Sequence, residues 1–431
     1  MKLELTNIGK IREAAIQLNG ITVIAGENNT GKSTIGKMLF CTFHAFYRIE
    51  EQIREERVKS VYRALSGYYH EMNNKLISRR NTMSFAEQVV DRKAEFLENR
   101  ELLFNTCREF YLSKRDHFEY TEKNIENLAG RIYLFLALDD EDIRQTILRK
   151  RLEAEFGMNV GHLNMPEKKA TVKLNIKNSS IHFEISRNSD IKIKNYINLT
   201  KEIIYIDDPF ILDQLMSSQW AFLLNEFEHQ QDLLKKIARE KQSEEFSVVD
   251  EVLAKKKIEN ILESMNDVCD GDIITQEERF VYQTKQLNGN LEMVNLSTGM
   301  KSFAILRRLL QNGTIDDNGI IILDEPEIHL HPEWQLKFAQ SIVLLQKEFG
   351  AHILLNTHSP YFLNAIEVYS AKYEIDNQCN YYLVDEMDGT VSVSEVTDRT
   401  EVIYEKLASP LQKLENLEYS NESTISNNRI I

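Results

Sequence analysis

The chain has 431 residues, of which 42% are hydrophobic, a net charge of −15 and four cysteines. This length allows two or three domains with a sizeable core, and no apolar run reaches 18 residues, so no membrane-spanning segment is expected. The acidic balance argues against a generic nucleic-acid binder, and the widely separated cysteines suggest a reduced cytoplasm with neither a disulfide framework nor a zinc site.

The N-terminal third predicts a short β-rich start and then a long helical stretch. Leu3 and Leu5 alternate with polar neighbours, and residues 21–25 form an apolar run typical of a buried strand. A glycine-containing loop follows, and a helix is expected from Lys32. Residues 45–155 are charged, nearly free of Gly and Pro, and apolar at helical spacing, which predicts a large helical insertion.

The rest of the chain predicts strands and helices in a mixed order. Alternating apolar residues indicate β-hairpins at 171–193, 280–294 and 381–393. Apolar runs indicate buried strands at 203–206, 320–324 and 352–356, and helical spacing occurs at 211–269, 300–311, 333–348 and 360–369. Residues 419–431 are rich in Ser and Asn and are expected to be disordered. These elements predict an α/β fold.

Residues 26–33, Gly-Glu-Asn-Asn-Thr-Gly-Lys-Ser, form a phosphate-binding loop between a strand and a helix. A glycine loop at a helix N-terminus lets backbone N–H groups face phosphate oxygens. Lys32 adds a positive charge there, and Ser33 is a candidate Mg²⁺ ligand. Asn29 should tolerate a left-handed backbone. The candidate nucleotide-binding residues of this segment are Gly26, Asn28, Asn29, Thr30, Gly31, Lys32, Ser33 and Thr34.

Paired carboxylates end the strand at 320–324. Asp324 is placed to hold the Mg²⁺ shell, and Glu325 is then the natural general base for an attacking water, because one side chain cannot serve the metal and also accept the proton. Thr357-His358-Ser359 follows the next apolar strand. This spacing favours a γ-phosphate contact by His358 over a merely structural histidine, so Glu325 and His358 are the candidate catalytic residues.

Leu296-Ser297-Thr298-Gly299 precedes an amphipathic helix. A Ser and a Gly at a helix N-terminus make an anion site, which makes Ser297 and Gly299 further candidate nucleotide contacts. Separately, His331-Pro332 predicts a helix start with Pro at the first position.

These four motifs, in this order, resemble those of the ATP-binding-cassette (ABC) ATPases. Glu325 to Pro332, Glu-Pro-Glu-Ile-His-Leu-His-Pro, is similar to the SMC/RecF/OLD-like branch, and especially to stand-alone ATPases of bacterial defence systems, the PtuA and RloA class. The resemblance implies an ABC-ATPase head, a P-loop NTPase sheet with a β-rich lobe, that binds and hydrolyses ATP with Mg²⁺. The expected division is head at 1–44, 156–210 and 270–418, helical insertion at 45–155, helical segment at 211–269, and tail at 419–431.

The resemblance also implies a shared site. Ser297 and Gly299 would serve the nucleotide bound by a second copy, so two chains would pack head to tail with two ATP molecules between them. A metal-contacting glutamine is implied as well, and Gln214, shortly after the strand 203–206, is the candidate. Met300-Lys301 departs from the pattern, because many relatives place an acidic or amide residue there.

Motif spacing separates the branches of this family. Ser33 and Ser297 are 264 positions apart (from 33 to 297), which is longer than in transporter cassettes and far shorter than in SMC proteins with their coiled coil. Only 62 residues follow Tyr369 (370 to 431), too few for the Toprim domain of OLD nucleases. No Arg has a His five positions later, as HEPN ribonucleases require. The effector is therefore expected on a separate protein.

The sequence thus predicts a cytoplasmic ATPase, a homodimer or higher homo-oligomer, that acts as the sensor and regulatory subunit of an anti-phage defence system. Its partner would be a separate effector, expected to be a nuclease, and no membrane partner is expected. The alternative is a RecF-like repair or recombination ATPase that clamps DNA directly. A basic groove would favour the DNA clamp, and a large apolar patch on the inserted helices would favour effector docking.

Overall fold

The computed structural model describes residues 1–70, 79–112, 121–157, 160–161, 168–186, 190–215, 227–240, 248–277, 279–284, 289–409 and 414. The chain divides into two compact units. The head comprises residues 1–45, 149–197 and 201–431, and the helical unit comprises residues 46–148 and 198–200. None of the described helices is both long and apolar enough to cross a membrane. The tail expected to be disordered lies outside the described residues.

The head is built on a sheet of 11 strands in the order β6-β5-β4-β1-β2-β14-β13-β3-β12-β11-β7. The strands are β1 (Lys2–Ile8), β2 (Ile11–Gln17), β3 (Ile21–Gly26), β4 (Ala170–Ile176), β5 (Ser179–Ile185), β6 (Ile191–Asn195), β7 (Ile203–Ile206), β11 (Ile320–Asp324), β12 (His352–Thr357), β13 (Cys379–Met387) and β14 (Thr390–Glu395). A smaller sheet pairs β8 (Asp272–Gln276), β9 (Arg279–Gln283) and β10 (Asn290–Glu292). The second strand of the hairpin predicted at 280–294 ends at Glu292, because Met293–Asn295 forms a 3-10 helix.

Five neighbouring strands, β13, β3, β12, β11 and β7, run parallel to one another. Every residue of β3, β7 and β11 is buried, which explains why these strands are continuous apolar runs in the sequence. The carboxyl ends of parallel strands meet at one edge of a sheet. The loops that follow β3, β7, β11 and β12 therefore share an edge, and β12 lies between β3 and β11.

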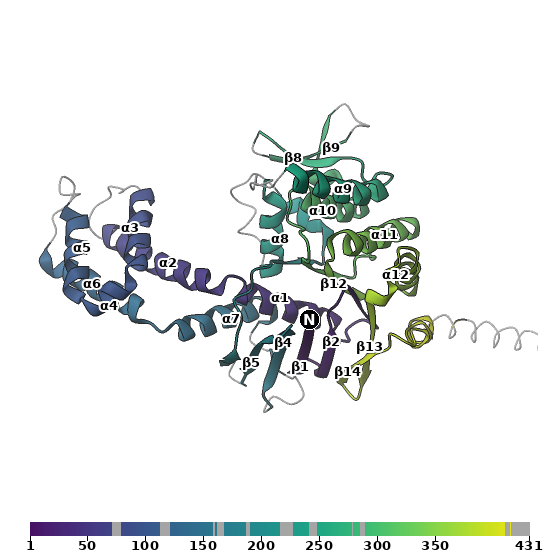
Figure 1. Ribbon diagram of the computed structural model, residues 1–431, viewed down its shortest axis with the longest axis horizontal. Coiled ribbons are helices and arrows are strands. Elements are labelled where there is room, and N and C mark those ends of the chain that lie inside the picture. Colours follow the sequence, from purple (N-terminus) through teal and green to yellow (C-terminus); the bar gives the residue numbers. More distant parts are fainter. Residues whose placement is uncertain are drawn as a thin grey trace, which may run out of the picture. The chain divides into compact units, whose positions relative to one another are not determined.

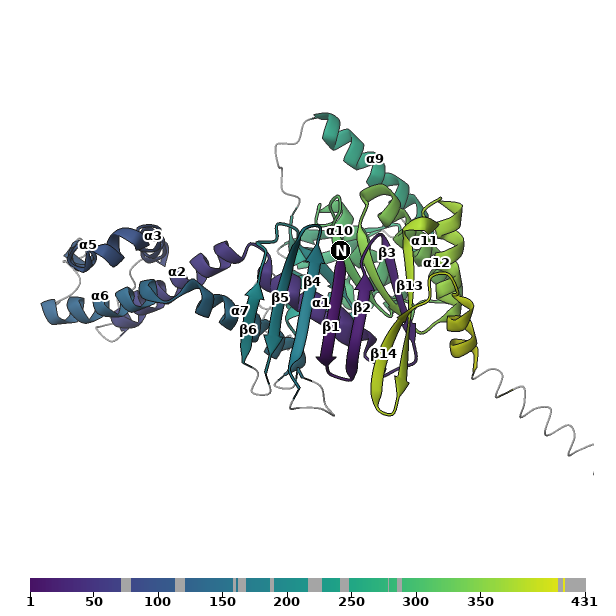
Figure 2. The same cartoon turned by 60° about the horizontal axis from the view of Figure 1, so that its bottom comes forward.

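The other half of the sheet is antiparallel and forms the β-rich lobe. The order is β6, β5, β4, β1 and β2, and Figure 2 shows β5, β4, β1 and β2 side by side. The predicted hairpin at 171–193 is present as β4 and β5, with Lys177 at a positive φ of 51° in the turn. β14 joins the halves, since it pairs antiparallel with β13 and parallel with β2. The predicted α/β head with a β-rich lobe is confirmed.

Helices of the head pack around a large apolar core. They are α8 (Glu228–Ala238), α9 (Val248–Met265), α10 (Thr298–Gln311), α11 (Pro332–Phe349) and α12 (Pro360–Lys372). A further helix, α1 (Lys32–Phe46), follows the loop after β3. As predicted, Pro332 is the first residue of α11, with His331 as its N-cap. Gly350 ends α11 with a φ of 62°, the left-handed position where glycine is favoured. α11 packs against α12 and α9, as Figure 1 shows.

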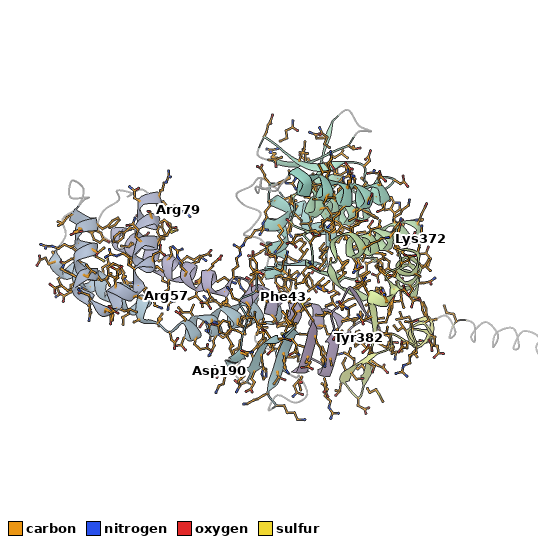
Figure 3. The ribbon with its side chains drawn as sticks, in the orientation of Figure 1. Phe43, Arg57, Arg79, Asp190, Lys372 and Tyr382 are labelled. Carbon is orange, nitrogen blue, oxygen red and sulfur yellow. The ribbon has the colours of Figure 1, made fainter. Side chains whose placement is uncertain are left out.

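The helical unit has its own core. It contains α2 (Ile49–His70), α3 (Arg79–Asp91), α4 (Lys93–Glu98), α5 (Arg100–Leu112), α6 (Glu122–Ala137) and the first part of α7 (Asp140–Phe156). Phe96, Leu103 and Tyr111 are fully buried in it. Arg57, labelled in Figure 3, is also buried, and it donates a 2.5 Å hydrogen bond to the Leu138 carbonyl and pairs with Asp140 at 2.6 Å. The last turns of α7, from Arg149, belong to the head, whereas the sequence placed them in the insertion.

Candidate nucleotide-binding site

The loop between β3 and α1 has the backbone shape that its sequence predicts. Asn29 and Gly31 have positive φ angles of 63° and 88°, in the region that Asn and Gly adopt most readily. Gly26 is required for a different reason: a side chain there would come within 2.7 Å of the Val384 carbonyl on β13. The loop therefore curls tightly against the sheet, and its backbone N–H groups precede the N-terminus of α1.

Lys32, the first residue of α1, is only 3% exposed. Its Nζ donates hydrogen bonds to the carbonyls of Gly26 at 3.0 Å and Glu27 at 2.8 Å, and it lies 3.4 Å from Oε1 of Glu325. Thr30 closes the loop by donating from Oγ1 to the Glu27 carbonyl at 2.8 Å. A buried ammonium group is thus held inside the loop, where it faces the carboxylate at the end of β11.

The other predicted loop residues occupy different places. Asn28 is exposed, and Ser33 is half-buried in the first turn of α1. Thr34 lies beside the β1–β2 turn, since its methyl group is 3.6 Å from where a side chain at Gly9 would begin. Their roles toward a nucleotide stay predictions.

Asp324 ends β11 and is 8% exposed. Oδ2 accepts a 2.8 Å hydrogen bond from the Tyr205 hydroxyl, and Oδ1 accepts a 2.9 Å hydrogen bond from the Asn356 side-chain amide. Burial, together with the nearby charge of Asp324, raises the pKa of Tyr205 well above its usual value, so the phenol remains a donor. Two donors on neighbouring strands therefore fix the Asp324 carboxylate while leaving it further lone pairs for a cation.

Glu325 has a φ of 50°, unusual for a residue other than glycine. Such a conformation costs on the order of 1–3 kcal/mol, and it persists only where the surroundings enforce it. Here the backbone N–H of Glu325 donates to the Asn356 carbonyl at 2.9 Å. Oε1 lies 3.4 Å from both Lys32 Nζ and His358 Nδ1. The strained residue thus presents its carboxylate between the phosphate-loop lysine and the histidine.

His358 follows β12, the strand between β3 and β11. Its ring is partly exposed, and its backbone N–H donates to Oε1 of Glu327 at 3.2 Å. The structure therefore brings together Lys32, Glu325 and His358 at one edge of the sheet, in the segments that follow the three adjacent strands β3, β11 and β12.

A buried cluster lies at the end of β7, the strand next to β11. His229 of α8 bridges Oδ2 of Asp207 at 2.8 Å and Oε2 of Glu155 at 2.7 Å. Burial alone would lower the pKa of His229, but the hydrogen bonds to these two carboxylates raise it to about 9. The imidazole is therefore a cation at neutral pH, and it balances two carboxylates close to Tyr205 and Asp324.

Ser297 caps the N-terminus of α10 and is exposed. Its Oγ accepts a 3.4 Å hydrogen bond from the backbone N–H of Met300. Gly299 is buried, and a side chain there would meet the Trp334 ring at 2.9 Å. Packing therefore already requires glycine at this position, apart from any nucleotide. Lys301, the departure from the family pattern, turns inward, is 2% exposed and pairs with Asp213 at 2.5 Å.

Gln214 ends the 3-10 helix Pro209–Gln214, which packs against α10. Its Oε1 is buried and has no hydrogen-bond partner within the described part of the chain. The position directly after β7 belongs to Asp207, and the register that pairs Leu323 with Ile206 places Asp207 next to Asp324. A metal contact by Gln214 stays a prediction. Asp207, the carboxylate next to Asp324, is not among the site residues predicted from the sequence.

Comparisons with known proteins show which proteins the chain is similar to. Residues 164–364, a little less than half of the chain, match a family described as AAA domain, putative AbiEii toxin, Type IV TA system. The Septu protein PtuA of Bacillus thuringiensis is 32% identical over 93 residues, which are 19% of this chain and 23% of that protein. The Retron Vc95 probable ATPase of Vibrio cholerae serotype O1 biovar El Tor is 31% identical over 106 residues, which are 22% of this chain and 20% of that protein.

The predicted resemblance to the ATPases of the PtuA class is confirmed. The aligned segments span about a fifth to a quarter of the curated relatives' length. Among solved structures, an SMC head bound to the C-winged helix domain of ScpA aligns over 93% of this chain and 98% of that chain, with 12% identity and a TM-score of 0.43.

Proposed function

We propose that the chain binds ATP and hydrolyses it to ADP and phosphate. The observation that carries this proposal is the convergence of Lys32, Glu325 and His358 at the carboxyl edge of the parallel sheet, with 3.4 Å from the Glu325 carboxylate to each of the other two. A buried cation, a carboxylate on a strained backbone and a histidine, next to a phosphate loop, are the groups that phosphoryl transfer to water needs.

Each residue has a role in this proposal. Lys32 and the N–H groups of the loop bind the β- and γ-phosphates. Glu325 accepts the proton of the attacking water, and His358 contacts the γ-phosphate. Ser33 and Asp324 would hold Mg²⁺, which neutralises phosphate charge when bound, and the hydrogen bonds of Asp324 to Tyr205 and Asn356 leave it suited to that task.

The proposed assembly is a head-to-tail dimer in which Ser297 serves the nucleotide of the second copy. Ser297 is exposed at the N-terminus of α10, where the helix dipole favours an anion. Large apolar side chains are exposed on segments next to this end of the helix: Phe210 (43%), Val294 (49%) and Ile328 (53%). A second copy seated there would cover them, and a γ-phosphate shared by two chains would make dimerisation depend on ATP.

The proposed biological role is that of a sensor and regulatory subunit in an anti-phage defence system, with a separate nuclease as effector and the helical unit as its docking surface. The similarity to the Septu and retron proteins supports this role. The alternative is a RecF-like ATPase that clamps DNA. The head carries 35 Lys and Arg against 48 Asp and Glu, a net charge of −13, which disfavours direct DNA binding.

A purified chain tests the proposal. It should hydrolyse ATP only with Mg²⁺, Lys32→Ala should abolish nucleotide binding, and neither DNA nor RNA should be cut. Absence of ATP turnover in the purified wild type, alone and with its effector, would overturn the enzymatic assignment. If the purified chain cuts DNA or RNA with a metal ion, and a substitution within this chain abolishes the cleavage, the proposal of a separate effector would be wrong.

A further inference from the structure

Glu327 is a third carboxylate on the loop after β11, and the roles above leave it unassigned. The residue is 2% exposed. Its Oε1 accepts two hydrogen bonds, one from Thr357 Oγ1 at 2.5 Å and one from the backbone N–H of His358 at 3.2 Å. Both donors lie at the end of β12. A single buried oxygen therefore joins the loop that carries Glu325 to the loop that carries His358.

A buried glutamate can be half of an ion pair, a metal ligand or an uncharged hydrogen-bonding group. The His358 Nδ1 is 3.8 Å from Oε1, which is beyond hydrogen-bond distance. The described residues contain no group of three or more His, Cys, Asp or Glu side chains that could hold a metal ion. A metal cluster therefore lacks support among the described residues, and an ion pair with His358 would form only with a protonated ring and without a hydrogen bond.

The uncharged form suits these contacts better than the ionised form does. Oε1 accepts two hydrogen bonds, as a carbonyl oxygen can, while Oε2 is buried and has no partner among the described residues. An ionised carboxylate with one oxygen in such a place would be costly. Burial raises the pKa of Glu327, against the opposing effect of the Thr357 hydrogen bond.

The place of the His358 ring depends on its backbone. Nδ1 is buried and makes no hydrogen bond in the described part of the chain, although it lies 3.4 Å from Oε1 of Glu325. The hydrogen bonds at Thr357 and at the His358 N–H therefore fix the backbone that carries the ring.

We infer that Glu327 is a positioning residue for ATP hydrolysis: it fixes Thr357 and His358 so that the histidine ring stays in place beside Glu325. The inference rests on the proposed function, because positioning matters only if His358 takes part in turnover. Glu327 does not itself touch the reacting atoms. Its loss should lower kcat and leave ATP affinity nearly unchanged, since the phosphate loop is independent of it.

Matched substitutions test this inference. Glu327→Gln keeps an uncharged side chain with an acceptor oxygen and should retain kcat within about twofold. Glu327→Leu keeps the volume but removes the acceptor, and kcat should fall on the order of 10–10²-fold, as expected for a displaced catalytic group. The dissociation constant for ATP should change less than about threefold. Glu333→Leu, at an exposed carboxylate on the first turn of α11, is the control and should have no effect.

A second variant covers the case in which Glu327→Leu does not fold. Thr357→Val keeps the shape of the side chain but removes two hydrogen bonds, the one donated to Glu327 and the one accepted from the Ser359 N–H. It should lower kcat by about three- to thirtyfold, as expected for the loss of up to two hydrogen bonds. Wild-type kcat in both Glu327→Leu and Thr357→Val would overturn the inference. Loss of kcat in Glu327→Gln equal to that in Glu327→Leu would also overturn it, because the uncharged acceptor should suffice.

Amide hydrogen exchange at His358 separates this inference from the proposed function. The His358 N–H should be protected in the wild type and in Glu327→Gln, and it should exchange faster in Glu327→Leu. If the wild type does not hydrolyse ATP, the proposed function fails. Hydrogen exchange still shows whether Glu327 holds the His358 N–H. Unchanged protection in a folded Glu327→Leu protein would then overturn the positioning role.

Discussion

The carboxyl edge of the parallel sheet and the helical unit differ in what they bury. The edge buries Lys32, Asp324 and Glu327 within a network of hydrogen bonds. The helical unit buries aromatic and aliphatic side chains, and among its described residues the buried polar or charged ones are Arg57, Thr82 and Arg144. A buried charge is costly unless it is paired. The buried charged groups at the edge therefore indicate a functional site rather than a packing requirement.

The head and the helical unit also differ in net charge. The helical unit has 17 Lys and Arg against 19 Asp and Glu, a net charge of −2, compared with −13 for the head. Its buried arginines pair within the unit, as Arg57 does with Asp140 and Arg144 with Glu141. These ion pairs serve packing, so we expect substitutions in the helical unit to affect stability or partner binding, and substitutions at the sheet edge to affect turnover.

The sharpest test of this difference compares two carboxylates. Glu325→Gln should keep ATP binding and lower turnover on the order of 10²–10⁴-fold, as expected for a general base, and ATP-bound dimer should accumulate in light scattering. Asp140→Asn, which weakens the pairs with Arg57 and Lys93, should leave turnover unchanged and lower the unfolding midpoint. Near-normal turnover in Glu325→Gln would remove this residue from its role.

A second test asks whether one chain supplies all the residues of its ATP site. Ser297→Arg places bulk and positive charge where the γ-phosphate of the second copy should bind, and Lys32→Ala removes the phosphate-loop cation. Each variant alone should be inactive. Mixing them should restore part of the activity, because a heterodimer retains one intact composite site. Normal hydrolysis by Ser297→Arg alone would rule out the shared site.

The sequence predicted the ends of the strands better than the contacts between them. The phosphate loop, Asp324, Glu325 and His358 each belong to a short motif next to an apolar run, and such runs mark buried parallel strands. Tyr205 and Asn356 lie inside apolar strands, and only the pairing of β7, β11 and β12 brings them to Asp324.

The buried cluster at the end of β7 shows the same limit. Asp207 directly follows a predicted strand, and that position could have suggested a site residue. Glu155 and His229 come from helices that are distant in sequence, and no local pattern places them together. The division of α7 between the two units was missed for a similar reason, because helical periodicity continues unchanged across Arg149.

A third test concerns the proposed docking surface of the helical unit. Leu134 and Leu138 follow one another by one helical turn at the end of α6 and are 64% and 51% exposed. Changing both to Glu should leave ATP turnover within about twofold and abolish co-purification with the separate effector. Val252 and Leu253 of α9, 49% and 53% exposed, provide the matched pair in the head, and their change to Glu should leave that binding intact. A tenfold loss of turnover in the α6 variant would mean that these helices act on the nucleotide site.

The smallest expected effect is a dependence of stability on pH that is confined to the head. Hydrogen bonds to Asp207 and Glu155 raise the pKa of His229 to about 9 in the folded state, whereas an unfolded histidine has a pKa of about 6.5. The folded chain therefore holds one more proton between these values, so this stabilisation is complete below about pH 6.5 and is lost as pH rises through about 9. Between these pH values the free energy of unfolding should fall by up to about 1.4 kcal/mol per pH unit. Urea unfolding at pH 7 and 8.5 should show this loss of stability in the wild type and not in His229→Gln. Ionisation of the thiols is common to both proteins and cancels in the difference.

The pKa of Asp140, in the helical unit, shifts in the opposite direction: burial alone would raise it, but Lys93 and Arg57 lower it. Its contribution to stability therefore disappears only in acid. Hydrogen exchange should accordingly show protection falling in α8 and β7, and not in α2 or α6, as pH rises from 7 to 8.5 after correction for the intrinsic exchange rate. An equal fall in both units would mean that they unfold together and that the buried histidine stabilises the whole chain.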